Sequence, residues 1–259
     1  MQKLESGVRA AFSSLGAETV HARAAERAIM TTDTVPKACA VRVAGPAGTY
    51  TVGGMAKGSG MIAPNMATML SFVTTDAALD HQLLQKITCR VTERTFNRVT
   101  VDGDTSTNDS LFVLAGGASG VRVTAENAAP FEEALEAVLT ELCRMIARDG
   151  EGATRLIEVC VSGADTEEDA VLVARAVGES LLFKCAVAGG DPNWGRIVCA
   201  AGYSGAPVVP ETTTVYIGEV CVVRGGTPTG DDASDPMRAD TVTVRIDLGQ
   251  GNEAARVLS

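Results

Sequence analysis

The spacing of apolar residues along the chain predicts a mixture of helices and strands. Apolar side chains recur every three or four residues, as in amphipathic helices, over residues 1–30 (with a break near Gly16), 80–96, 130–148 and 165–177. Shorter apolar or alternating runs predict strands at 39–43, 50–52, 69–73, 99–102, 111–114, 156–161, 213–223 and 241–248. The turn sequence Gly45-Pro-Ala-Gly48 joins the first two strands into a predicted hairpin.

These elements do not follow the regular strand–helix–strand repeat of a parallel α/β fold. The predicted class is therefore α/β in its α+β form, or a layered α-β-β-α body. Residues 225–240 are rich in Gly, Pro and Asp and predict a loop. Residues 249–259 carry no convincing structural signal.

Composition narrows the class of protein. The chain has 259 residues, of which 46% are hydrophobic and 21% charged, as in ordinary soluble globular proteins. A net charge of −10 argues against nucleic-acid or anionic-membrane partners. No apolar run approaches the roughly 18 residues of a membrane-spanning helix, and the first residues lack the features of a signal peptide. We expect a cytoplasmic protein without a membrane partner.

Cysteine and histidine usage limits the available chemistry. The seven cysteines occur singly among apolar neighbours and predict buried, reduced thiols. The two histidines, His21 and His81, stand in polar contexts. Two histidines and cysteines without metal-ligand spacing provide few of the residues that a Ser-His-Asp site or a zinc site needs, so we expect no metal. Nucleophilic chemistry would need a base other than histidine.

The stretch from Lys57 to Leu70 is the strongest candidate for chemistry. Its glycines and proline predict a loop, and the small-residue junction Ala67-Thr68 stands just before the strand at 69–73. If Thr68 attacked the Ala67 carbonyl and water resolved the ester, Thr68 would gain a free α-amine. That amine titrates near pH 8 and is a base for the hydroxyl beside it. An ordinary threonine after a loop is the alternative interpretation.

This stretch resembles the self-cleavage motif of the ornithine acetyltransferase (glutamate N-acetyltransferase) family. Further motifs resemble the same family in the same order, namely residues 28–34, 53–57, 102–109, 149–154 and 190–196. The resemblance covers about residues 5 to 248. It implies a layered α-β-β-α sandwich in which residues 1–67 and 68–259 are the α and β chains of one interlocked catalytic body. These chains would associate into a heterotetramer.

The resemblance also implies an activity. Thr68 would take the acetyl group from N-acetylornithine, and glutamate would collect it from the acyl-enzyme in arginine biosynthesis. No cofactor is expected, although acetyl-CoA is an alternative acetyl donor in some members. The implied substrate-binding residues are Thr31, Lys57, Thr68 and Glu151. Lys57 suits the substrate carboxylate, and Glu151 suits the ornithine side-chain ammonium.

Other readings of these motifs stay open. The hydroxyls of residues 31–34 could cap a helix or build a turn, and Lys57 could be solvated. Residues 102–109 lack the terminal glutamate of a calcium loop and predict a packed polar turn near the site. Residues 189–195 lack a phosphate-loop Lys-Ser/Thr pair, so Asp191 or Asn193 is predicted to cap the following helix.

The sequence also departs from the family pattern. No Thr-Gly pair, which supplies the family's oxyanion hole, precedes Lys57. The family's C-terminal asparagine and hydroxyl residue have no match in residues 249–259. Two alternatives follow: a catalytically impaired remnant or assembly partner of the same fold, and a related N-terminal-nucleophile amidase or aminopeptidase.

Overall fold

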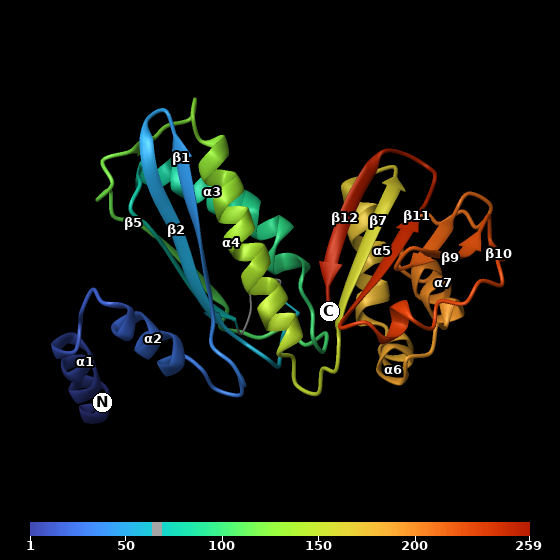
Figure 1. Cartoon of the computed structure of the whole chain (residues 1–259), viewed down its shortest axis with the longest axis horizontal. Coiled ribbons are helices and arrows are strands. Elements are labelled where there is room, and N and C mark those ends of the chain that lie inside the picture. Colours follow the sequence, from blue (N-terminus) through green and yellow to red (C-terminus); the bar gives the residue numbers. More distant parts are fainter. Residues whose placement is uncertain (64–68) are drawn as a thin grey trace.

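The chain folds into two lobes, each built on one large β-sheet, with a two-stranded sheet, β4-β6, added in the first lobe and two helices projecting from the N-terminal side (Figure 1). The computed structural model describes residues 1–63 and 69–259. The helices are α1 (Gln2–Ser13), α2 (Thr19–Ala28), α3 (His81–Arg94), η1 (Phe96–Arg98), α4 (Ala129–Arg148), α5 (Glu167–Glu179), α6 (Leu181–Gly189), α7 (Trp194–Gly202) and η2 (Pro236–Arg238). The strands are β1 (Lys37–Gly45), β2 (Gly48–Lys57), β3 (Leu70–Thr75), β4 (Ala78–Leu79), β5 (Ser110–Ala115), β6 (Arg122–Val123), β7 (Leu156–Ala164), β8 (Thr214–Ile217), β9 (Val220–Arg224), β10 (Thr227–Pro228), β11 (Thr241–Asp247) and β12 (Glu253–Leu258).

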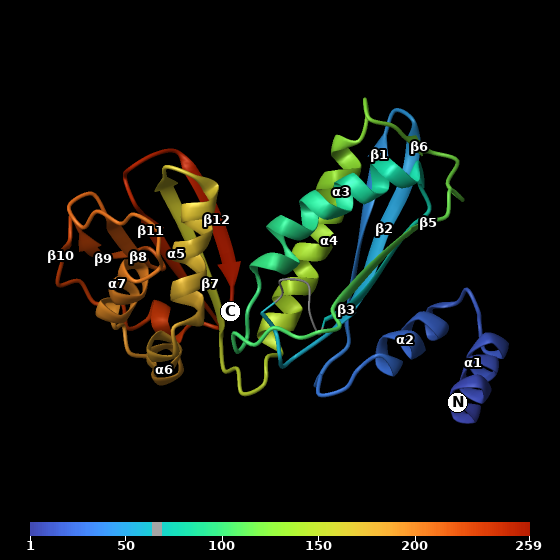
Figure 2. The ribbon, with the colours of Figure 1, turned by 180° about the vertical axis from the view of Figure 1, so that it is seen from behind.

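The first lobe, residues 37–148, carries a sheet in the order β1-β2-β3-β5. The predicted hairpin is confirmed, because β1 and β2 pair antiparallel through the turn at Gly45–Gly48. Helices α3 and α4 cover one face of the sheet (Figure 2), where Leu135, Val138 and Leu142 of α4 are fully buried. In β3, buried residues alternate with half-buried or exposed ones, as this one-sided packing leads us to expect.

The second lobe, residues 156–258, carries a sheet in the order β10-β9-β8-β11-β7-β12. Helix α5 packs on β7 and β12, and α6 and α7 extend the helical layer (Figure 1). Its core is separate from that of the first lobe and consists largely of valine and alanine side chains. Both sheets combine with helices, so the predicted mixed α/β class is confirmed.

Two predictions for individual segments were wrong, and one segment for which no element was predicted contains a strand. Residues 99–102 form no strand: Val99 makes only an isolated parallel bridge with Leu258, and the N–H groups of Thr100 and Val101 bond to the carbonyls of Leu258 and Ile62. The run 213–223 is a hairpin, since Gly218 turns with φ of 57° between β8 and β9. The segment after Gly249 contains β12, which pairs antiparallel with β7.

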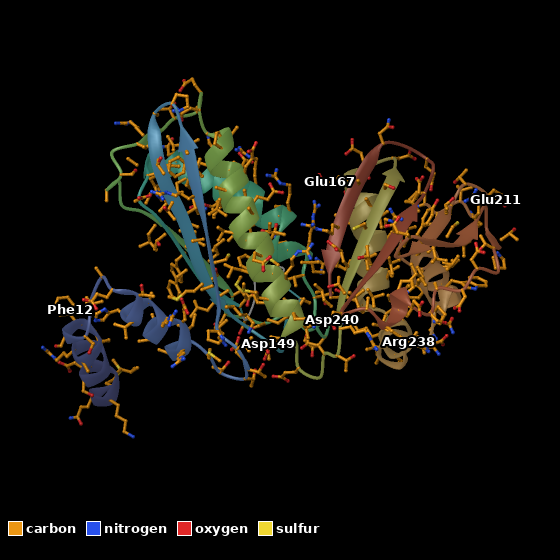
Figure 3. The ribbon with its side chains drawn as sticks, in the orientation of Figure 1. Phe12, Asp149, Glu167, Glu211, Arg238 and Asp240 are labelled. Atoms are coloured by element: carbon orange, nitrogen blue, oxygen red, sulfur yellow. The ribbon has the colours of Figure 1, made fainter. Side chains whose placement is uncertain are left out.

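The helices predicted over residues 1–30 are confirmed, with a break between Ser13 and Thr19. Neither α1 nor α2 has a buried residue, and Phe12 lies exposed on α1 (Figure 3). Of the two predicted caps, Asp191 and Asn193, it is Asn193 that caps α7, because its side chain accepts the N–H of Arg196. None of the helices in the described ranges is long and apolar enough to cross a membrane.

All seven cysteines lie within the described ranges and are free thiols. The prediction that they are buried was wrong for most of them, because only Cys143 is buried and Cys89, Cys185 and Cys199 are exposed. Burial raises the pKa of the Cys39 thiol to about 11, with a further contribution from Glu141.

Candidate active site

The loop that joins β2 to β3 emerges at the end of the first lobe that faces the second. Lys57, the last residue of β2, pairs with Leu70, the first of β3, so the loop leaves and re-enters the sheet at one point. Its described residues are 58–63 and 69. The predicted cleavage site, Ala67-Thr68, lies outside the described residues.

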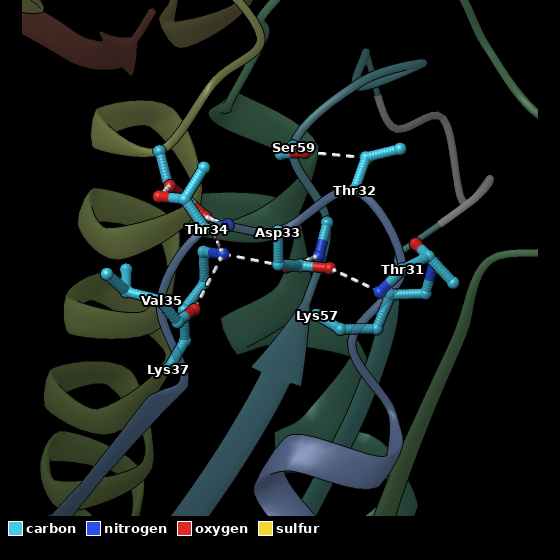
Figure 4. Close-up of polar contacts among 10 residues, drawn as sticks. Thr31, Thr32, Asp33, Thr34, Val35, Lys37, Lys57 and Ser59 are labelled. Atoms are coloured by element: carbon cyan, nitrogen blue, oxygen red, sulfur yellow. Dashed lines mark hydrogen bonds and ion pairs between the residues drawn. The ribbon is translucent and has the colours of Figure 1, made fainter.

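Two of the predicted substrate-binding residues are in direct contact. The Lys57 Nζ atom donates a hydrogen bond of 2.9 Å to the Thr31 hydroxyl (Figure 4 shows both side chains). Thr31 comes from the segment between α2 and β1 and is exposed. The adjacent hydroxyl, Thr32, instead meets the hydroxyl of Ser59 at 2.8 Å. The Thr31–Lys57 pair is therefore a polar group open to a ligand at the edge of the loop.

Glu151 contacts the same loop at Ser59 and Gly60. Its backbone N–H donates to the Ser59 carbonyl at 2.7 Å. A Cβ atom on Gly60 would lie 2.7 Å from the Glu151 carboxyl carbon, so only glycine fits there without moving the glutamate. Glu151 follows α4 and is exposed. Thr31, Lys57 and Glu151 thus all lie at or beside one loop, and their role in substrate binding stays a prediction.

A buried ion cluster, consisting of Asp33, Lys37 and Asp149, lies directly behind these residues. The Lys37 ammonium contacts the Asp33 carboxylate at 2.7 Å and the Asp149 carboxylate at 2.6 Å (Figure 4). The side chains of Asp33 and Lys37 have no exposed surface, and that of Asp149, at the end of α4 (Figure 3), is 6% exposed. Removing three charges from water is tolerated because each is paired and hydrogen-bonded.

The buried ion cluster connects three backbone segments. Asp33 accepts the N–H of Gly58 at 2.7 Å and that of Thr31 at 3.1 Å. Asp149 accepts the N–H of Thr34 at 2.9 Å and also its hydroxyl. The start of the loop, the segment before β1 and the end of α4 are therefore fixed relative to one another.

These contacts lower the pKa of both carboxyl groups. Burial alone would raise the pKa of Asp33, but the hydrogen bonds from Gly58 and Lys37 outweigh it. Burial likewise opposes the shift at Asp149, where bonds from Lys37 and Thr34 hold the pKa below its usual range. Both groups are thus stabilised as carboxylates.

A cavity of about 300 Å³ adjoins the site between the end of α4 and α6. Its wall includes Glu151, Val101 and Lys184. The Lys184 Nζ atom donates to the Val101 carbonyl at 2.7 Å, and burial lowers the pKa of this amine. In the described ranges, no three His, Cys, Asp or Glu side chains are grouped so that they could hold a metal ion.

The residues of the buried ion cluster were present in the quoted motifs or beside them, but no role was predicted for them. Lys37 follows a loop proline, and such a lysine normally indicates a solvated position. Its burial depends on Asp149, which is 112 residues away in the sequence. The contact could have been predicted only by assuming that the motifs at 28–34 and 149–154 meet at the same loop.

Comparison with known proteins identifies similar chains. A sequence model described as the ArgJ family matches residues 1–259. The glutamate N-acetyltransferase of Methanocaldococcus jannaschii is 52% identical over 240 residues, which cover 88% of this chain and 60% of the relative. The arginine biosynthesis bifunctional protein ArgJ of Symbiobacterium thermophilum is 49% identical over 257 residues, with 97% and 63% covered.

A solved structure agrees with these matches. The crystal structure of the arginine biosynthesis bifunctional protein argJ from Bacillus halodurans superposes with a TM-score of 0.72 at 45% identity. The alignment covers 74% of this chain and 93% of that chain. The chain therefore spans 60% and 63% of the length of the two curated relatives, and nearly all of the solved chain.

Proposed function

Because the chain belongs to the ArgJ family, we propose that it is a self-processing acetyltransferase of arginine biosynthesis. Its relatives are named glutamate N-acetyltransferase and arginine biosynthesis bifunctional protein ArgJ. The proposed reaction moves an acetyl group from N-acetylornithine to glutamate, giving ornithine and N-acetylglutamate.

The observation that carries this proposal is the arrangement of Thr31, Lys57 and Glu151 around the loop that contains Ala67-Thr68. An amino-acid substrate presents a carboxylate, and the Lys57 ammonium complements it. Ornithine presents a second amine, which the exposed Glu151 carboxylate complements. Lys57 stands where the loop begins, and the Glu151 carboxylate lies against Gly60 of the same loop, so groups of both charges are available to one substrate.

Processing would proceed in two steps. The Thr68 Oγ atom attacks the Ala67 carbonyl carbon, the C–N bond breaks, and the Thr68 nitrogen takes the hydroxyl proton to become an amine. Water then hydrolyses the resulting ester, which releases the Ala67 carboxylate and restores the Thr68 hydroxyl. The new α-amine titrates near pH 8 and is the base for later turnover.

Turnover would use the same oxygen. The Thr68 hydroxyl attacks the acetyl carbonyl of N-acetylornithine, its proton passes to the leaving ornithine nitrogen, and an acetyl ester of Thr68 remains. The glutamate amine then attacks this ester, which yields N-acetylglutamate and the free hydroxyl. Two half-reactions through a covalent intermediate predict ping-pong kinetics.

The proposal extends to the assembly. The chains 1–67 and 68–259 would stay together after cleavage, since β2 of the first pairs with β3 of the second. Association of two such pairs into a heterotetramer is proposed from the family resemblance alone. Acetyl-CoA is proposed as an alternative donor, with no bound cofactor. Free thiols at all seven cysteines favour a reducing compartment such as the cytoplasm.

Denaturing mass spectrometry of the purified chain tests the processing step. We expect two fragments whose masses correspond to cleavage between Ala67 and Thr68. The variant Thr68→Ala should stay intact. Thr74→Ala, which changes an exposed threonine of β3, is the matched control and should be cleaved. An unmodified chain that stays intact would contradict the proposal.

Transfer is tested separately, by following an isotope-labelled acetyl group from N-acetylornithine to glutamate. Lys57→Met and Glu151→Gln should each raise the KM for amino-acid substrates. Cleavage without transfer would favour the impaired remnant. Hydrolysis of the donor without any need for glutamate would favour the amidase or aminopeptidase alternative.

A further inference from the structure

A polar turn of the first lobe contacts the loop on both sides of Ala67-Thr68. This turn, residues 102–109, follows η1 and leads into β5 and is called the acidic turn below. It contains the motif Asp102-Gly-Asp-Thr-Ser-Thr-Asn-Asp109. None of its residues contributes to the polar contacts of Thr31, Lys57 or Glu151 described above, so the proposed function leaves its role open.

Asp102 holds the upstream flank by two hydrogen bonds. One carboxylate oxygen accepts the N–H of Met61 at 2.6 Å, and the other accepts the N–H of Ile62 at 3.0 Å. Met61 has a φ of 56° and is the only non-glycine residue in the described ranges with a positive φ. This conformation is unfavourable for a residue with a side chain. Asp102 therefore holds the backbone in a strained conformation before the cleavage site.

Two further contacts reinforce this flank. The Thr105 hydroxyl donates to the Ala63 carbonyl at 2.9 Å. The Val101 N–H donates to the Ile62 carbonyl at 2.6 Å, and the Ile62 side chain is fully buried. Residues 61–63 are thus fixed by backbone and side-chain groups of residues 101–105.

Asp109 holds the downstream flank. Its carboxylate accepts the N–H of Met69, and the Met69 carbonyl accepts the N–H of Ser110 at 2.8 Å. The Met69 nitrogen is covalently bonded to the carbonyl carbon of Thr68. The hydrogen bond to Asp109 therefore acts on the peptide unit that follows the nucleophile directly.

We propose that the acidic turn is a clamp that positions the Ala67–Thr68 bond for self-cleavage, with Asp102 and Asp109 as positioning residues. The inference rests on the proposed self-processing. Intramolecular attack depends steeply on how the reacting groups are oriented. A single turn that holds residues 61–63 and residue 69 by hydrogen bonds fixes both ends of the segment that is to be cleaved.

The rate of processing during cell-free synthesis tests the clamp, with intact chain and fragments counted by denaturing mass spectrometry. Asparagine keeps the shape of aspartate but offers one acceptor oxygen and no charge. We expect Asp102→Asn and Asp109→Asn each to slow cleavage by about 10- to 100-fold. Asp104→Asn removes the same charge from the same turn at an exposed residue and should be cleaved at the unmodified rate.

A pair of substitutions at Met61 distinguishes positioning from a general loss of structure. Glycine adopts a positive φ without the energetic penalty that a Cβ atom causes, whereas alanine still has this penalty. In the Asp102→Asn background, Met61→Gly should therefore restore cleavage by about tenfold. Met61→Ala removes nearly as much of the side chain and should restore none. Equal cleavage rates in the two double variants would overturn the role of Asp102.

The remaining outcomes separate this inference from the proposed function. If the unmodified chain is never cleaved, both are overturned. If it is cleaved and Asp102→Asn and Asp109→Asn are cleaved as fast, only the clamp is overturned. The thermal midpoint of each aspartate variant is measured in the Thr68→Ala background, where no chain is cleaved. A variant that is unfolded there loses cleavage through unfolding, and that result also overturns the clamp.

Discussion

Two groups of ion pairs, one at the edge of the first lobe and one within it, have similar geometry but opposite surroundings. The buried ion cluster joins Lys37 to Asp33 and Asp149 at 2.6 to 2.7 Å, with almost no exposed surface. A surface ion group joins α3 to α4 through Arg90, Arg94, Glu132 and Glu136 at 2.6 to 3.0 Å. Its side chains are 20% to 54% exposed. Distance does not distinguish the two groups, whereas access to water does.

The difference shows what each group contributes. Water screens the surface group, and α3 and α4 are already joined by apolar contacts, so its pairs add little to stability. The buried ion cluster holds backbone N–H groups of the loop and of residues 31–34. Leaving one of its charges without a partner would cost far more, because water cannot replace the partner. The buried cluster therefore determines the geometry of the site.

Removing the central charge of the buried ion cluster should have the largest effect. Lys37→Met leaves the Asp33 and Asp149 carboxylates buried without their cation. We expect the free energy of unfolding, measured with urea in the Thr68→Ala background, to fall by about 3–5 kcal/mol. Lys86→Met makes the same change at an exposed position of α3 and should alter it by less than about 0.5 kcal/mol. A similar small change at Lys37 would contradict the comparison.

Removing one carboxylate should have an intermediate effect. Asp149→Asn keeps the side-chain shape, but Lys37 retains only Asp33 as a charged partner and the bonds from Thr34 weaken. A hydrogen bond to a charged group contributes about 1.5–3 kcal/mol, and we expect a loss of that size. Asp240→Asn, at a carboxylate that is 92% exposed, is the control for the loss of one negative charge. Equal losses in the two variants would show that burial does not matter here.

Acid should reduce the difference in unfolding free energy between the protein with Asp149 and the Asp149→Asn variant. The folded-state pKa values of Asp33 and Asp149 are lowered, so the unfolded chain takes up their protons more readily than the folded chain. Their contribution is complete above about pH 5 and is lost as the pH falls below the ordinary aspartate pKa of about 3.9. The gap between the two unfolding free energies should therefore narrow from pH 6 to pH 3. A constant gap would show that Asp149 is not stabilised as a carboxylate.

The sequence pattern predicted most of the fold because most elements have one apolar face. Helix α4 and the β1–β2 hairpin were predicted from local periodicity and turn residues. The strand β12 was not predicted, because two of its six residues are alanine and its pattern is weak. It forms because Val257 and Leu258 bury their side chains beside β7, a partner nearly 100 residues earlier. Long-range pairing of this kind leaves little local signal.

The candidate site was predicted to a different extent. The positions of Thr31, Lys57 and Glu151 followed from motifs that resemble a known family, and the structure brings them around one loop. The contacts that hold these residues and their loop in place were not predicted. The burial of Lys37 and the contacts of Asp102 with Met61 and Ile62 are tertiary contacts. A charged residue in a motif predicts polarity at that position, but not whether water or another residue satisfies it.

Breaking the surface ion group should have the smallest effect. Hydrogen bonds from Arg90 and Arg94 lower the pKa of Glu132, which favours its carboxylate form. Exposed pairs contribute about 0–1 kcal/mol, and Glu132→Gln should reduce the free energy of unfolding by no more than that. Because the pairs are accessible to counterions, raising the salt from 0.05 M to 1 M should remove most of the difference. The loss caused by Lys37→Met should persist at the same salt concentration, since its partners are buried. A salt-resistant loss of several kcal/mol at Glu132 would mean that the surface group, too, is a structural support.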